Sequence, residues 1–178
     1  MTGHRAAKRY AKSLIELAIE QDCLEHVHDD MQLFSTVIRE NRLFAVMLKN
    51  PIVNHDKKRN IIHALFDKRM NKLSLLAFDL ITRKNRERIL EEIANEFQVQ
   101  YNAFKGLQVA EITTTMKLDD EMRNKFNDLV REISGKEAKL DEIVDENIVG
   151  GFVLNIGDKR LDQSIKSQLN SIKRELTN

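Results

Sequence analysis

The 178-residue chain has little of several residue types that mark specialised protein classes. Cys23 is its only cysteine, so no internal disulfide can form and a reducing compartment suits the chain. One proline, six glycines and no tryptophan exclude collagen-like and low-complexity sequences. No apolar run approaches the length needed to cross a bilayer. The composition that remains is that of a globular, mostly helical protein.

A strong charge of one sign is also missing. Lys and Arg number 29 against 28 Asp and Glu, a formal net charge of +1, so no overall field draws the chain to nucleic acid or an anionic membrane. Residues 1–13 are basic and free of acids, but no apolar segment follows them, which argues against a secretory signal. We interpret them as part of a helix, because Glu16 and Glu20 continue the pattern that Arg5 begins.

Apolar side chains recur at intervals of three and four over residues 5–104, which predicts helices. Asn50-Pro51 interrupts this pattern, because the residue before a proline avoids the helical conformation. Asn54 and Asn85 are expected to be helix N-caps. Six helices joined by short connections make a bundle. The predicted helices cover residues 5–20, 22–40, 42–49, 55–67, 71–83 and 86–104.

The hydrophobic period changes after Gly106. Residues 107–116 are rich in β-branched side chains and are predicted to form a strand. Asp119 or Asp120 should then cap a helix that ends at Gly135, a residue suited to the left-handed conformation after a helix. Helix and strand signals therefore alternate in this part of the chain.

Two further strands are predicted over residues 140–144 and 152–156. Gly157-Asp158 should form a hairpin-like turn, and Asp162 should cap a final helix. The predicted fold is mainly α, with an N-terminal six-helix bundle over residues 1–105 followed by a small α/β C-terminal domain over residues 106–178.

Motifs for catalysis are absent or weak. No phosphate-binding Gly-x4-Gly-Lys-Ser/Thr motif occurs, and Gly150-Gly151 is interpreted as a turn beside a buried strand. His26 and His28 would point to different sides of a helix and could not share a metal ion. With Asp29 and Asp30 they are interpreted as solvent-facing. We therefore expect no catalytic residues, no metal site and no cofactor.

Two rival functions remain from the residues alone. A small enzyme could build a site from distant groups such as His63 and Cys23, although a contact between His63 and Asp67 would be an ordinary surface pair. A helical nucleic-acid-binding module could use the basic residues within 83–88, but exposed aromatic side chains for base stacking are lacking. We interpret residues 57–59 and 83–88 as solvated helix faces and partners of helix C-termini.

Two predicted helices have more apolar surface than one-sided packing needs. At about 100° per residue, the apolar side chains of residues 7–18 cover an arc about 200° wide, whereas about 100° is enough. The apolar side chains of residues 73–81 extend almost all the way round, interrupted by Ser74 and Asp79. Such helices are either central in the bundle or leave a hydrophobic groove for a partner helix.

Two segments of the chain resemble one protein family. The opening Arg9-Tyr10-Ala11-Lys12-Ser13-Leu14 is one of them. The other is Ile148-Val149-Gly150-Gly151-Phe152-Val153-Leu154-Asn155-Ile156-Gly157-Asp158, followed by Leu161-Asp162-x-Ser164-Ile165. Together they resemble the delta subunit of F-type ATP synthase, known in mitochondria as the oligomycin-sensitivity-conferring protein. The resemblance covers nearly the whole chain, and the glycine-pair segment is its specific part. The opening lacks the extension of an imported organellar precursor, so we expect a bacterial protein.

The resemblance implies a non-catalytic stator subunit. Such a subunit links the catalytic head to the peripheral stalk, so that the head does not rotate with the central stalk during proton-driven ATP synthesis. In that family the N-terminal domain binds an N-terminal helix of an alpha subunit between its first and fifth helices, and the C-terminal domain binds the C-terminal ends of the b subunits. The two helices with excess apolar surface here are the predicted first and fifth.

The resemblance also implies a location and a set of contacts. We expect a peripheral protein on the cytoplasmic face of the bacterial inner membrane, associated with the membrane through the complex, with no nucleic-acid partner and no homo-oligomer. In this interpretation the glycines of residues 150–157 serve turns, and Phe152 and Leu154 face one side of a sheet. Carried over by position, the residues expected in the groove for the alpha-subunit helix are Tyr10, Ala11, Leu14, Ala18, Leu73, Leu76, Ala77 and Leu80.

Overall fold

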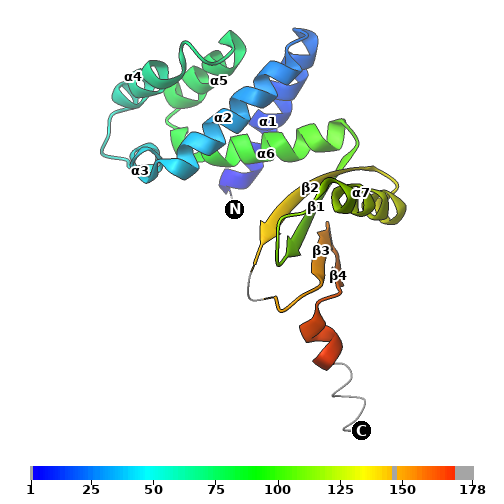
Figure 1. Ribbon diagram of the computed structural model, residues 1–178. Coiled ribbons are helices and arrows are strands. Elements are labelled where there is room, and N and C mark those ends of the chain that lie inside the picture. The colour runs from blue at the N-terminus through cyan, green and yellow to red at the C-terminus, as the bar shows by residue number, and fades with distance from the viewer. Residues whose placement is uncertain (1, 146–147, 171–178) are drawn as a thin grey trace. The chain divides into compact units, whose positions relative to one another are not determined.

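The computed structural model describes residues 2–145 and 148–170. The chain divides into two compact units, residues 1–101 and residues 102–178. Helices make up the first unit, and the second contains a four-stranded sheet with one long helix against it (Figure 1). The predicted fold class, mainly α with a helical N-terminal part and a small α/β C-terminal part, is confirmed. The division lies a few residues before the joint predicted at 104–106.

Local sequence signals located the helices of the first unit well. Observed and predicted ends differ by four residues at most, because the hydrophobic period and the breaks at Asn and Pro act within one turn. A 3₁₀ turn, η1 (Glu87–Ile89), precedes the last of them. The α-helices are α1 (Thr2–Glu20), α2 (Leu24–Glu40), α3 (Arg42–Lys49), α4 (His55–Phe66), α5 (Lys72–Arg83) and α6 (Leu90–Phe104).

The two predicted asparagine caps had different outcomes. Asn54 is the N-cap of α4, and its side chain accepts a hydrogen bond of 3.0 Å from the backbone N–H two residues on. The prediction for Asn85 is wrong: this residue has a φ of 53° and follows the end of α5. Its N–H donates to the Thr82 carbonyl (2.9 Å), and the Arg86 N–H donates to the Ile81 carbonyl (3.1 Å). These two bonds are those of a Schellman motif, so Asn85 ends α5 instead of starting the next helix.

The core of the first unit is built around Phe34. Its ring lies 4.6 Å from that of Phe78, 5.6 Å from that of Phe66 and 6.1 Å from that of Phe44, measured between ring centres. Such spacings are typical of attractive tilted and edge-to-face pairs. Helices α2, α3, α4 and α5 are therefore held together by one aromatic cluster.

Two polar interpretations from the sequence are wrong, because buried partners come from distant elements. Lys58, placed on a solvated face, is fully buried, and its Nζ donates to Glu87 Oε1 (2.6 Å) and to a backbone carbonyl of α3 (3.0 Å). Asp30 is also buried, and its Oδ2 accepts hydrogen bonds from the Asn71 N–H (2.8 Å) and Ser74 Oγ (2.5 Å). A carboxylate there accepts from the N–H of the residue that caps α5 and lies at the favourable end of the helix dipole.

The neighbouring histidine pair is only partly exposed. His26 and Asp29 are exposed as predicted, whereas His28 is half-buried and stacks on Tyr101 with ring centres 3.9 Å apart. The Tyr101 hydroxyl donates to Glu25 at 2.5 Å. Burial first, and then this hydrogen bond to a carboxylate, raise the pKa of Tyr101 to about 12.

The second unit is a four-stranded sheet with one helix on one face. The strands are β1 (Leu107–Thr114), β2 (Glu137–Val144), β3 (Phe152–Ile156) and β4 (Lys159–Asp162), in the order β2-β1-β3-β4. Strands β1 and β2 are parallel, and β3 is antiparallel to β1. The helix α7 (Asp120–Ser134) connects the parallel pair, with Asp119 as its N-cap and Gly135 in the left-handed conformation after it, as predicted. The side chains that form the core beneath this helix are Ala110, Ile112, Val130, Leu154 and Ile156, with Leu118.

One strand was not predicted. The turn at Gly157-Asp158 leads into β4 (Lys159–Asp162), which pairs antiparallel with β3. Asp162 therefore ends a strand, and its prediction as a helix N-cap is wrong. The helical residues begin at Ile165, and Ser164 is the cap, with its Oγ accepting from the Ser167 N–H (3.3 Å).

The second glycine of the pair, Gly151, is required by close backbone contact. The Gln163 N–H donates to the Phe152 carbonyl (2.9 Å), and this pairing brings the two segments together. A Cβ on Gly151 would lie 2.2 Å from the Gln163 carbonyl oxygen, and Gly151 also has a φ of 80°. Only glycine fits both conditions. The interpretation of this segment as turns that adjoin a strand is confirmed, with Phe152 and Leu154 both packed on the core beneath α7.

Candidate functional site

The eight residues expected in a groove between α1 and α5 divide into two groups. Four are at most 8% exposed and belong to the core of the first unit: Ala11, Leu14, Ala18 and Leu73. The other four reach the surface. Leu76 is 65% and Leu80 50% exposed, and Tyr10 and Ala77 are partly buried. The broad apolar arc of α1 thus serves mostly as core, while α5 keeps an exposed apolar edge.

The exposed members lie on two neighbouring helices. Helices α1 and α5 contact each other. At about 100° per residue, Leu76, Leu80 and Ala77 lie within an arc of about 100° on α5. On α1, Leu17 is 43% exposed and lies two turns after Tyr10, on the same edge of the buried arc. We call these five residues, Tyr10, Leu17, Leu76, Ala77 and Leu80, the α1/α5 stripe.

Leu17 is the member of this stripe that was not expected. The sequence placed it in the wide apolar arc of α1 but did not separate core positions from surface positions. Its spacing of seven from Tyr10 was the available signal, because residues two turns apart share a face.

A charged cluster borders the stripe on α5. Asp79 accepts a two-pronged contact from Arg59, from Nε to Oδ1 (2.9 Å) and from Nη2 to Oδ2 (3.2 Å), and it also contacts His63 Nε2 (2.8 Å). The other ring nitrogen of His63 lies 3.2 Å from Asp67, so the predicted pair between these residues is confirmed. Asp79 was missed as its partner, although it stands out as the one acid in the apolar run of α5.

The pKa shifts of this cluster follow from the contacts. Hydrogen bonds to Asp79 and then to Asp67 raise the pKa of His63 above its ordinary value. Burial favours the neutral form of Asp79, but the hydrogen bonds from Arg59 and His63 outweigh it and hold the pKa of that carboxyl below its usual range. The cluster therefore fastens α4 to α5 as a set of opposite charges.

The residues of the rival enzyme hypothesis have separate surroundings. Cys23 precedes α2 and packs against the helical core, while the side-chain partners of His63 are Asp67 and Asp79. In residues 2–145 and 148–170, no group of three or more His, Cys, Asp or Glu side chains is placed to hold a metal ion. The basic residues of the nucleic-acid hypothesis, Arg83, Lys84, Arg86 and Arg88, are all exposed.

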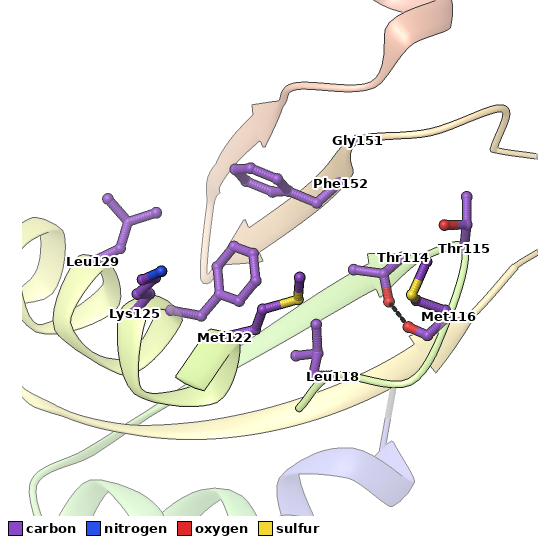
Figure 2. Close-up of a pocket in the computed structure, with 10 residues that line it drawn as sticks. Thr114, Thr115, Met116, Leu118, Met122, Lys125, Leu129, Gly151 and Phe152 are labelled. Carbon is purple, nitrogen blue, oxygen red and sulfur yellow. Dashed lines mark hydrogen bonds between the residues drawn. The ribbon is translucent and has the colours of Figure 1, made fainter. Parts of the chain in front are cut away.

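The second unit has an apolar groove of its own. It has a volume of about 570 Å³ and lies between α7 and the ends of β1 and β3 (Figure 2). Met116 and Met122 on its walls are 65% and 43% exposed. Phe126 and Phe152 meet edge to face at 4.9 Å between ring centres. The remaining lining residues are Thr114, Thr115, Leu118, Lys125, Leu129 and Gly151.

The groove has few polar groups, and two of them are engaged within the unit. Thr114 Oγ1 donates to the Met116 carbonyl (2.6 Å), as Figure 2 shows, and Lys125 pairs with Glu121 (2.6 Å). Methionine side chains adapt their shape to apolar partners. An apolar, methionine-lined groove of this kind suits the nonpolar face of a partner helix.

No helix in the described part of the chain is long and apolar enough to cross a membrane.

Known proteins resemble the chain over its full length. The family model described as ATP synthase delta (OSCP) subunit matches residues 6–176. The ATP synthase subunit delta of Cytophaga hutchinsonii is 39% identical over 173 residues, which cover 97% of this chain and 94% of the relative. That of Flavobacterium psychrophilum is 34% identical over the whole of both chains.

A solved structure shares the fold. A chain in the cryo-EM structure of the Toxoplasma gondii mitochondrial ATP synthase hexamer superposes with a TM-score of 0.73, covers 97% of both chains and is 19% identical. At that identity the likeness concerns the fold alone. The family model and the bacterial relatives cover nearly all of the sequence, so the resemblance drawn from its motifs is confirmed. The chain belongs to the ATP synthase delta (OSCP) subunit family.

Proposed function

We propose that this protein is a non-catalytic stator subunit of a bacterial F-type ATP synthase. It links the catalytic head to the peripheral stalk, so that the head does not turn with the central stalk during proton-driven synthesis. The observation that carries the proposal is that each compact unit has its own exposed apolar surface, the α1/α5 stripe in one and the methionine-lined groove in the other. A linker between two partners needs two such surfaces.

The first unit binds the N-terminal helix of an alpha subunit on the α1/α5 stripe. Leu76 and Leu80 supply the most exposed area, and an amphipathic helix would cover them at about 25 cal/mol per Å² of apolar surface, offset by the entropy of ordering. Tyr10, Leu17 and Ala77 extend the contact. The remaining expected groove residues, Ala11, Leu14, Ala18 and Leu73, support this surface from the core.

The second unit binds the C-terminal ends of the b subunits. The groove between α7 and the sheet supplies the contact, with Met116, Met122 and Phe152 against the apolar face of the partner. Attachment to the stalk and the head places the protein at the cytoplasmic face of the inner membrane, as a peripheral component held there by the complex.

The mechanism is mechanical and depends on tight binding at both surfaces. Torque from the central stalk acts on the head, and the subunit must resist it without dissociating. Apolar helix docking suits this task because it buries area without requiring a reactive polar group. The buried ion pair and the aromatic core of the first unit keep its helices in one arrangement under load.

Calorimetric titration of the full chain tests the head contact. A peptide that copies the N-terminal helix of the cognate alpha subunit should bind one-to-one with a negative heat-capacity change. Leu76→Asp should weaken binding at least tenfold. The matched control is Leu43→Asp on α3, which is 85% exposed and lies outside the stripe. Equal binding by wild type and Leu76→Asp would contradict the proposed head contact.

A second peptide tests the stalk contact in the same way. A peptide with the C-terminal sequence of the cognate b subunit should bind the full chain, and Met122→Asp should weaken that binding while leaving the alpha peptide unaffected. The variant Leu76→Asp should show the reverse pattern. If either variant weakened both peptides equally, the assignment of one partner to each unit would be wrong.

A further inference from the structure

A small basic pocket adjoins the α1/α5 stripe. It has a volume of about 120 Å³ and is lined by Ala6, Arg9, Tyr10, Ser13 and Arg86. Tyr10 is shared between the stripe and this pocket, so the two surfaces are continuous. Apart from Tyr10, its polar groups are the guanidinium groups of Arg9 and Arg86 and the hydroxyl of Ser13.

Arg86 is held in place by the backbone and by Tyr10. The Schellman turn after α5 fixes its backbone, with the Arg86 N–H bonded to the Ile81 carbonyl (3.1 Å). Its Nη1 donates to the Tyr10 hydroxyl (3.1 Å), and its guanidinium carbon lies 5.9 Å from the centre of the Tyr10 ring. A guanidinium on an aromatic ring loses less freedom on binding than a free one.

The positive charge of this pocket is not neutralised within the first unit. No carboxylate lines it, and in the part of the chain that the structure describes neither Arg9 nor Arg86 forms an ion pair. Two acids on the same helices have other partners: Glu16 lies 3.8 Å from Lys12, and Asp79 pairs with Arg59. The guanidinium groups are therefore available to an anion supplied by a partner.

We propose that this pocket is a carboxylate subsite. It takes an Asp or Glu side chain of the helix docked on the α1/α5 stripe and thereby sets the direction and register of that helix. The inference rests on the proposed head contact and specifies its chemistry. A guanidinium matches a carboxylate with two parallel hydrogen bonds, and Ser13 can donate a third.

The apolar stripe needs such a determinant. A row of leucine and alanine side chains accepts an amphipathic helix in either direction and in registers one turn apart with similar contact area. One charge pair at one end of the stripe removes this degeneracy, since the reversed helix would leave its carboxylate away from both arginines. Complementary charges at the margin of an interface act in this way on specificity and association rate.

The test is a double-mutant cycle on the full chain with the alpha-helix peptide as the probe. Arg86→Gln and Arg9→Gln should each weaken binding about 3- to 10-fold at low salt and reduce the salt dependence of the affinity. The control is Lys84→Gln, which removes an exposed charge two residues away that does not line the pocket, and it should change affinity less than about twofold.

Replacing the acidic residues of the peptide one at a time by their amides completes the cycle. One replacement should weaken binding to wild type by the same factor and have no further effect on Arg86→Gln. If the loss from Arg86→Gln and the loss from the peptide replacement multiplied at every acidic position, no peptide acid would depend on Arg86. That result would overturn the subsite. A nitroxide on the end of the peptide that carries the critical acid should broaden Tyr10 signals selectively in wild type, and equal broadening at Leu76 would overturn the fixed direction.

The outcome separates this inference from the proposed function. If Leu76→Asp abolishes binding while Arg86→Gln and Arg9→Gln leave it unchanged, the subsite is wrong and the head contact stands. If the peptide fails to bind the folded wild-type chain, the head contact is wrong and the subsite is overturned with it.

Discussion

The two units differ in how their proposed docking surfaces relate to their cores. Among the described residues, 23 buried apolar side chains form the core of the first unit, and 6 form that of the second. In the first unit the helices enclose one another, and the exposed leucines of α5 lie on an edge outside the core. In the second unit one helix covers one face of a small sheet, and Phe126 and Phe152 belong both to the core margin and to the groove.

This difference predicts different links between binding and stability. In the first unit the proposed binding residues Leu76 and Leu80 can change with little effect on the fold, because they contribute little to the core. In the second unit the groove cannot be altered at its aromatic wall without loosening the core.

The largest expected effect separates Leu14 from Leu76. Leu14 is 4% exposed, so Leu14→Asp buries a carboxylate without a partner and should destabilise the first unit by more than about 4 kcal/mol. Leu76→Asp should change stability by no more than about 0.5 kcal/mol. Urea unfolding of the full chain followed by circular dichroism measures both. A folded, stable Leu14→Asp protein would mean that this part of α1 is surface.

The next effect concerns the buried ion pair. Lys58→Met leaves Glu87 buried without its cation and should cost about 3 to 5 kcal/mol. Lys57→Met, on the exposed neighbour, is the control and should be near neutral. The double variant with Glu87→Leu should recover much of the loss, because two apolar groups can replace a buried pair. Equal stabilities of the two lysine variants would place residue 58 at the surface.

The third effect tests the link between core and groove in the second unit. Phe126 is half-buried, so Phe126→Ala should cost about 2 kcal/mol and should also weaken binding of the b-subunit peptide. Two probes, a helix signal for the first unit and a fluorophore on β2, distinguish the unfolding of the two units in the full chain. Loss of binding with unchanged stability would show that the groove is independent of the core.

Local signals explain why most of the fold could be predicted. The helices of the first unit follow from apolar residues that recur every three to four positions, and α7 follows from a cap at Asp119 and a glycine at 135. Each of these signals lies within one or two helical turns of the feature that it predicts. Asn85 was misassigned because an asparagine in a short connection between two helices suits both the end of one and the start of the next. The strand β4 was missed because four residues are too few to show an alternating pattern.

The site was only partly predictable, for a different physical reason. The spacing of apolar residues showed that α1 and α5 carry excess apolar surface. Whether those side chains are buried depends on which other helices cover them, and the spacing does not show that. Alanines at 7, 11 and 18 let other helices approach α1 closely, so its arc became core. The polar partners Lys58 and Glu87 are 29 residues apart, and Asp30 and Ser74 are 44 apart, so no local spacing indicates them.

The smallest expected effect is the pH dependence of the cluster beside the α1/α5 stripe. Hydrogen bonds to Asp79 and Asp67 raise the folded-state pKa of His63, so the protonated form is favoured on folding. Its stabilisation should be fully present below the unfolded-state pKa of about 6.5 and lost as pH rises through the folded-state pKa.

His63→Gln tests this sign, with His26→Gln on the exposed face of α2 as the control. Urea unfolding should show wild type more stable than His63→Gln by up to about 1 kcal/mol at about pH 5.5, and by less at about pH 8.5, since His63 is partly solvated and its interactions are screened. A gap that widens with pH would mean that His63 is neutral in the folded protein. Asp79 would then hold α4 to α5 mainly through its two contacts with Arg59.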